Sequence, residues 1–205
     1  MYVYETIQCV NFPCLDVKHG NFSVAQIQID PQKITAFLIS EAAPADITDA
    51  YYNGKDALFA KTTIQAFQDA GANVNSMQDI LNLGVYCTTA VKCGKTGYGI
   101  QSDTIKTCSF LLEKEISLFP NVKVFLLMGD VAIKAVNEIA RRNNQARVIP
   151  AGSTYKIRGQ DYYFQGKPAL PSYTQAGPSF FIEKIKRKMI AEDIGKALEL
   201  VAGSS

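Results

Sequence analysis

Residues 34–41 read Ile-Thr-Ala-Phe-Leu-Ile-Ser-Glu, a short apolar run that stops at two polar residues. A run of this length without alternation is typical of a parallel strand that is buried on both faces. Similar runs at 85–91 and 122–127, and a shorter one at 169–173, predict three more strands. Helical spacing of apolar residues predicts helices at 56–70, 76–83, 102–118, 129–142 and 179–201. This alternation predicts a three-layer α/β/α sandwich with a four-stranded, mainly parallel sheet.

Two local signals refine this expectation. Ser102 and Asp103 are residue types that cap helices, and we expect them to cap the helix that follows. Within residues 148–164 the apolar period changes to two, which predicts a β-hairpin around Gly159 and Gln160.

The composition is that of an ordinary globular chain. It has 205 residues, 47% of them hydrophobic, and a net charge of +2, so we expect one domain over residues 1–205. The longest uninterrupted apolar run, Val124–Met128, is far too short to span a bilayer. Residues 1–5 lack the basic start and apolar stretch of a signal peptide, so a cytoplasmic protein without a membrane partner is expected.

Four of the five cysteines form two pairs in the sequence. Cys9 and Cys14 lie near the N-terminus. Cys93 lies just past the second predicted strand, and Cys108 lies in the predicted helix that follows. Four thiolates from two separated pairs suit a [4Fe–4S] cluster or a tetrahedral zinc ion. The alternative is no metal, with all five thiols, including Cys87 inside the strand, packed as small apolar groups. A single histidine argues against a zinc site with two histidines.

Five segments, in order, resemble motifs of the uracil-DNA glycosylase superfamily, most closely those of its iron–sulfur (family 4 type) branch. They are Ile39–Pro44, Tyr86–Cys93, Leu127–Ala132, Lys156–Gly159 and Leu170–Tyr173. The resemblance implies the uracil-DNA glycosylase-like fold. It also implies a [4Fe–4S] cluster held by Cys9, Cys14, Cys93 and Cys108.

These enzymes flip a base out of DNA into a pocket and hydrolyse its N-glycosidic bond. The resemblance implies that a polar residue on the loop after the first strand orients water, and a carboxylate on that loop is a candidate base that activates the water. Glu41 is the first candidate, with Asp46 and Asp49 as further ones, although both also suit helix caps on a surface turn. The implied base pocket comprises Ala42, Phe59, Thr89, Leu170, Ser172 and Tyr173. Phe59 also suits the core of the helix at 56–70, and Tyr51 and Tyr52 are the alternative pocket residues.

The chain departs from the family pattern at two positions of this pocket. Thr89 stands where the family has a base-reading Asn, and Leu170 stands where it has a His that stabilises the leaving base. Leucine donates no hydrogen bond, so these departures argue against ordinary uracil excision. His19, the one imidazole of the chain, is a candidate replacement; the alternative is a packed or surface residue.

Two functions are therefore expected from the sequence. One is a DNA repair glycosylase that acts on uracil or another damaged base, with single-stranded or damaged DNA as partner and basic residues such as Lys184, Lys186 and Arg187 as phosphate contacts. The alternative is a catalytically silent iron–sulfur protein of the same fold that uses the pocket for a different ligand.

Overall fold

The computed structural model describes residues 1–203, and within them the strands form one six-stranded sheet with the order β1-β3-β2-β4-β6-β5. Four strands run parallel: β2 (Ala36–Ala43), β3 (Val85–Lys95), β4 (Val124–Met128) and β6 (Lys167–Ser172). The two-residue strands β1 (Val17–Lys18) and β5 (Tyr163–Phe164) add antiparallel edges. The α/β sandwich is confirmed. The strand count is larger than expected because two-residue strands have no sequence period.

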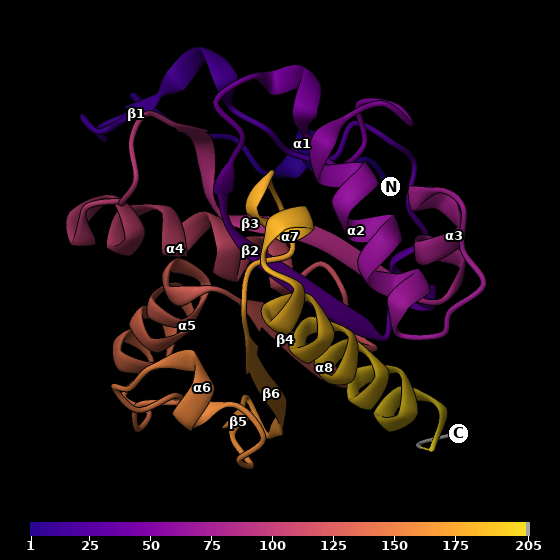
Figure 1. Cartoon of the computed structure of the whole chain (residues 1–205). Coiled ribbons are helices and arrows are strands. Elements are labelled where there is room, and N and C mark those ends of the chain that lie inside the picture. The colour runs from indigo at the N-terminus through magenta and orange to yellow at the C-terminus, as the bar shows by residue number, and fades with distance from the viewer. Residues whose placement is uncertain (204–205) are drawn as a thin grey trace.

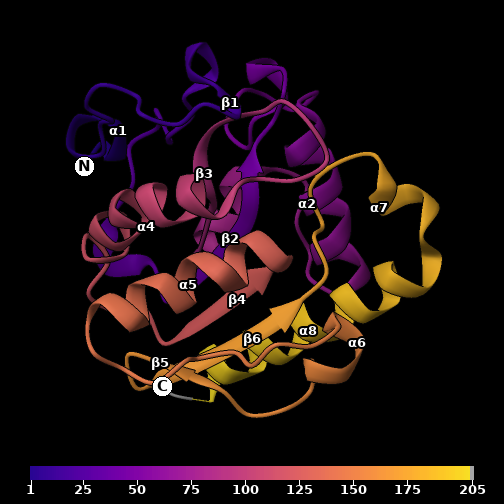
Figure 2. The same ribbon diagram turned by 90° about the vertical axis from the view of Figure 1, so that its left-hand side faces the viewer.

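Helices cover both faces of the sheet (Figure 1). One face packs against α4 (Ser102–Ile116) and α5 (Asp130–Arg142), which lie in front of the strands in Figure 2. The other face packs against α2 (Leu58–Asp69), α3 (Met77–Asn82) and α8 (Lys184–Ala202). The short helical segments are α1 (Val3–Thr6), η1 (His19–Asn21), η2 (Pro31–Lys33), η3 (Ile47–Asp49), α6 (Thr154–Ile157) and α7 (Ser179–Ile182). In residues 1–203, no helix combines the length and apolar composition that crossing a bilayer requires.

Strand β2 shows why the sheet is buried on both faces. Phe37 and Ile39 pack into the layer of α4 and α5, whereas Leu38 between them packs into the layer of α2 and α8. Successive side chains of a strand point to opposite faces, so an apolar run without alternation fills both layers at once. The polar residues at the end of β2 therefore come to the edge of the sheet.

The structure corrects two expectations in the C-terminal third. The predicted hairpin around Gly159 is absent from that position, and a turn of helix, α6, lies where its first strand was expected. The hairpin joins β5 to β6 instead, through Gln165 (φ 52°) and Gly166 (φ 74°), as a type I′ turn requires. The final helix is split into α7 and α8 because Glu183 leaves the helical conformation (ψ 73°).

The start of α4 is held from a distant part of the chain. Ser102 is the first helical residue rather than a cap, and Gln101 precedes the helix without a capping side chain of its own. Instead, the backbone N–H of Gln101 donates to Asp16 Oδ2 at 2.6 Å, and the Thr104 hydroxyl donates to Asp16 Oδ1. Burial alone would raise the pKa of Asp16, but these hydrogen bonds outweigh it and lower the pKa.

A fully buried ion pair joins α4 to β3. The Lys92 ammonium contacts Glu115 Oε2 and also donates to the Thr88 hydroxyl (2.7 Å) and the Thr89 carbonyl (2.6 Å). The Tyr86 hydroxyl donates to Glu115 Oε1 at 2.7 Å. Each charge is thus surrounded by polar partners, which a buried pair needs to offset its loss of hydration.

Breaking this pair should be costly. The Glu115→Gln variant leaves the Lys92 charge buried without a counter-charge, and we expect its free energy of unfolding to fall by about 3–5 kcal/mol. Urea denaturation measures the change. The control is Lys134→Gln, which breaks the exposed pair with Asp130 and should cost less than about 1 kcal/mol. Equal losses in the two variants would contradict a special role for the buried pair.

Candidate active site and cysteine cluster

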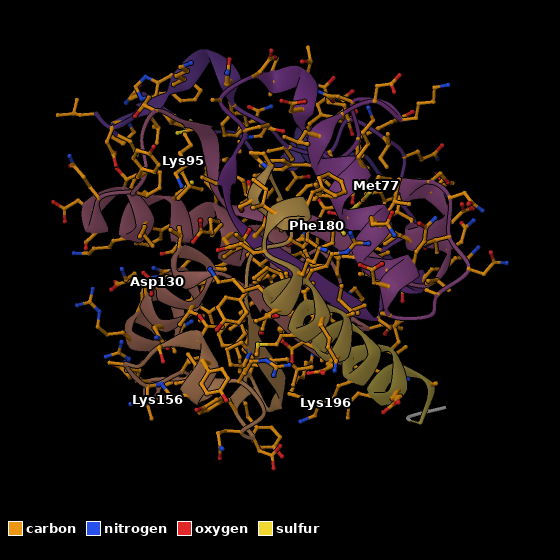
Figure 3. All side chains as sticks on the ribbon, viewed as in Figure 1. Met77, Lys95, Asp130, Lys156, Phe180 and Lys196 are labelled. Atoms are coloured by element: carbon orange, nitrogen blue, oxygen red, sulfur yellow. The ribbon has the colours of Figure 1, made fainter. Side chains whose placement is uncertain are left out.

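A cavity of about 690 Å³ opens at the carboxyl ends of β2 and β3. The loops that follow β2, β3 and β6 meet there, and Figure 3 labels Lys95 at this end of β3. The lining residues are 40–46, Asp49, Leu58, Phe59, 95–98, Thr174 and 176–179. Ligands of parallel α/β sheets bind beyond the carboxyl ends of the strands, so this cavity is the candidate active site.

Glu41 lies on the cavity wall, held between two other elements. Its side chain is about one-quarter exposed, and Oε2 lies 3.9 Å from the Lys95 ammonium. On its other side is Gly129 (φ 101°), where an added Cβ would come within 2.7 Å of Glu41 Oε1. A glycine at the start of α5 therefore leaves the room that the carboxylate occupies. The positive end of the helix dipole favours a negative charge there.

The other two candidate carboxylates, Asp46 and Asp49, also line the cavity but are engaged in local hydrogen bonds. Asp46 Oδ1 accepts from the Thr48 backbone N–H (3.0 Å) and hydroxyl (2.7 Å), and these bonds lower its pKa. Asp49 Oδ1 accepts from the backbone N–H of Leu58 at 3.0 Å and so holds the start of α2. Both act as caps, which leaves Glu41 as the carboxylate with most freedom to act on a water molecule.

Two of the predicted base-pocket residues, Ala42 and Phe59, line the cavity. Phe59 presents an aromatic ring there, and the ring of Tyr51 packs behind it with centroids 5.4 Å apart. A cavity with one aromatic wall and a few polar groups suits a flat organic ring.

Thr89 and Leu170 do not line this cavity, contrary to the placement that their motifs implied. The Thr89 hydroxyl donates to the backbone carbonyl of Val91 at 2.9 Å. Leu170 is 6% exposed and packs in the layer of α2 and α8, because it pairs with Leu126 inside the sheet. Position 170 therefore contributes no side chain to this cavity.

Ser172 and Tyr173 are not lining residues either. Ser172 is buried and donates to Asp193 Oδ2 at 2.6 Å, which fastens the end of β6 to α8. The Lys186 ammonium lies 5.4 Å from the centre of the Tyr173 ring. The chain reaches the cavity one residue later, at Thr174.

Most lining residues were not among the predicted site residues, and the polar ones include Ser40, Lys95, Tyr98 and Thr174. Ser40 is the first polar residue after the apolar run of β2, which was a usable signal. Tyr98 is fully exposed on the loop after β3, and Thr174 follows the end of β6. Neither of these loops carries a pattern that predicts which side chain faces the cavity.

The four paired cysteines surround a second cavity of about 290 Å³: Cys9, Cys14, Cys93 and Cys108 all line it. Cys93 and Cys108 are buried, and the other two are partly exposed. The backbone N–H of Lys92 donates to Cys108 Sγ at 3.2 Å. Cys87 packs in the opposite layer of the protein, away from this cavity.

Burial raises the pKa of Cys93 to about 12 and that of Cys108 to about 11. The charges of Cys9 and Cys14 contribute to both shifts, which indicates that the four thiols lie within electrostatic range of one another. Among residues 1–203, no three His, Cys, Asp or Glu side chains converge closely enough to hold one metal ion. The four thiols line the wall of the cavity and are not close enough to one another to share a single metal ion.

His19 belongs to this second cavity and not to the first. One of its ring nitrogens lies 2.6 Å from the Cys14 carbonyl oxygen, and its ring packs on Phe12 with centroids 5.2 Å apart. It does not take the place of a histidine in the candidate active site.

Comparison with known proteins gives one informative similarity. A type-5 uracil-DNA glycosylase of Thermus thermophilus is 25% identical to this chain over 122 residues, which is 60% of the chain. The matched region spans only 53%, about half, of that relative's length. No family model matches the sequence.

The raised thiol pKa values predict an order of reactivity in reduced protein kept free of metal by a chelator. At pH 7.5 iodoacetamide should modify Cys9 and Cys14 first, Cys93 and Cys108 much more slowly, and Cys87 last, because only the thiolate reacts. Peptide mass spectrometry after timed quenching measures the order, and protein in guanidinium should lose it. Modification of Cys108 as fast as Cys9 in the folded protein would contradict this reading.

Proposed function

We propose that this protein is a DNA N-glycosylase that removes uracil or another damaged base, working in the cytoplasm. The observation that carries the proposal is that Glu41 and Phe59 line one cavity at the carboxyl edge of the sheet. The similarity to the Thermus thermophilus uracil-DNA glycosylase supports it.

In this proposal the base leaves the DNA stack and enters the cavity against Phe59. Stacking of a base on an aromatic side chain contributes about 1–3 kcal/mol, which offsets part of the cost of unstacking. That cost is lowest for single-stranded or damaged DNA, which is therefore the expected partner.

Glu41 is the proposed general base. Its carboxylate takes a proton from a water molecule as the water oxygen bonds to the sugar carbon, while the bond to the base breaks and its electron pair leaves with the base. The departing base then carries negative charge. Lys95 and Thr174 both line the cavity, and in this proposal the Lys95 ammonium and the Thr174 hydroxyl stabilise that charge.

We also propose that Cys9, Cys14, Cys93 and Cys108 hold a [4Fe–4S] cluster, with zinc as the alternative. The donor set fits: four thiols surround one hollow, and the N–H of Lys92 donates to the Cys108 sulfur, as it would to a thiolate ligand. The cluster would supply a covalent tie between the N-terminal segment, β3 and α4. No step of base excision passes through it.

The ion pairs of α8 distinguish among its basic residues as candidate phosphate contacts. Lys186 pairs with Glu183, and Arg187 pairs with Asp69. Lys184 and Lys188 are exposed and have no ion-pair partner among residues 1–203. These two lysines are the better candidates for contact with DNA.

Protein purified without oxygen should be brown, with a broad absorbance near ~400 nm from charge transfer between thiolate and iron. The Cys93→Ala variant should lose this absorbance, whereas Cys87→Ala should keep it because Cys87 lies in the other layer. The reverse pattern, or colourless protein with stoichiometric zinc, would contradict the cluster.

The activity is tested with single-stranded oligonucleotides that contain uracil or hypoxanthine. The Glu41→Gln variant should lower the excision rate by about 10²–10⁴-fold, since an amide cannot take a proton from water. Glu138→Gln is the control, because Glu138 pairs with Arg141 on α5 and does not line the cavity. No excision by folded wild-type protein would favour the catalytically silent alternative.

A further inference from the structure

A chain of buried hydroxyl and amide groups ends at Ser40 on the cavity wall. Gln175 Nε2 donates to the Tyr51 hydroxyl at 2.9 Å and to the Thr63 hydroxyl at 3.2 Å. The Tyr51 hydroxyl donates to Ser40 Oγ at 2.7 Å, and Ser40 Oγ donates to the Thr88 carbonyl at 3.3 Å. Ser40, Tyr51, Thr63 and Gln175 are all at most 5% exposed.

Ser40 is left with hydrogen-bonding capacity after these contacts. A serine hydroxyl carries one proton and two lone pairs, and Tyr51 occupies one of the lone pairs. The bond to Thr88, at 3.3 Å, is longer than the usual range for two oxygens. One lone pair of Ser40 Oγ therefore has no hydrogen-bond donor within residues 1–203, and Ser40 lines the cavity.

Tyr51 links this chain to the aromatic wall. Its ring packs on that of Phe59, and its hydroxyl fixes Ser40. Burial raises the pKa of the Tyr51 hydroxyl well above its usual value, so the group stays protonated and donates. Tyr51 thus contacts both Phe59, the aromatic residue of the cavity wall, and Ser40, the polar residue beside it.

Glu41, the next residue in β2, faces the other way. It lies against Gly129 and Lys95, whereas Ser40 faces the layer of Tyr51. Because successive side chains of a strand point to opposite faces, Ser40 and Glu41 would contact a bound molecule from different sides.

We propose that Ser40 reads the polar edge of the bound ring by accepting a hydrogen bond from a ring N–H, and that Tyr51 is the residue that positions it. The ligand class is a flat heterocycle with an N–H beside a carbonyl, as in uracil and hypoxanthine. Cytosine and adenine have no proton on the corresponding ring nitrogen. This inference rests on the proposed function and names the base edge that the site selects.

The test compares 1-methyluracil, in which N1 is blocked as it is in DNA, with 1,3-dimethyluracil, which also lacks the N3–H, in ligand-observed NMR titrations of the full chain. The wild type should bind 1-methyluracil about five- to tenfold more tightly, the contribution of one buried hydrogen bond. This ratio should fall close to one in Ser40→Ala and Tyr51→Phe, and Ser40→Thr should restore part of it. Tyr52→Phe is the matched control and should keep the ratio, since the Tyr52 hydroxyl bonds to the backbone of Cys87.

The outcomes separate this inference from the proposed function. Binding of 1-methyluracil with an unchanged ratio in Ser40→Ala would overturn the role of Ser40 and leave the glycosylase proposal standing. Binding of neither compound by the wild type would overturn both. If Ser40→Ala does not fold, as judged by thermal melting, the comparison of Tyr51→Phe with Tyr52→Phe decides.

Discussion

The parallel pairing of β2 with β3 is the constraint on which both candidate sites depend. Its register runs from Ala36 opposite Val85 to Ala43 opposite Gly94, with an irregularity between Ala42 and Ala43. An added Cβ at Gly94 would come within 2.9 Å of the Pro44 carbonyl oxygen and within 2.8 Å of Asn21 Cβ. The loop after β2 and the N-terminal segment can both approach β3 only because this residue has no side chain. One close approach therefore shapes the edge where the active-site cavity opens and brings the N-terminal cysteines towards Cys93.

The buried ion pair lies between the two sites and connects them. The backbone N–H of Lys92 bonds to Cys108 Sγ, its ammonium bonds to Thr88, and the Thr88 carbonyl accepts from Ser40. A path of hydrogen bonds through Lys92 and Thr88 of β3 thus links the cysteine cavity to the active-site cavity. The groups of this path are buried, and hydrogen bonds tie both Ser40 and Cys108 to the same strand.

The sequence predicted the sandwich well because long apolar runs and helical periods depend on local composition. It also placed Glu41, Phe59 and the four cysteines in segments that do meet at cavities. It failed where the deciding contact is distant, as in the capping of α4 by Asp16, which lies 85 residues before Gln101. A motif fixes a position in the chain but not the direction of a side chain, and Leu170 accordingly lies in the layer of α2 and α8 and not on the cavity wall.

Leu170 stands where the family pattern has a histidine, but it lies inside β6 and not on the cavity wall. A side chain inside a strand that pairs with β4 cannot reach beyond the end of the sheet, whatever its chemistry. From this part of the chain only residues after β6 reach the cavity, and Thr174 is the first of them on its wall. A neutral hydroxyl offers one donor, whereas the Lys95 ammonium carries a full charge and also balances Glu41. In the proposed reaction, negative charge moves from Glu41 to the departing base, and the Lys95 ammonium attracts both charges, because attraction between opposite charges strengthens as water is excluded from the cavity. Lys95, rather than a residue at position 170, is therefore the proposed source of positive charge for the departing base.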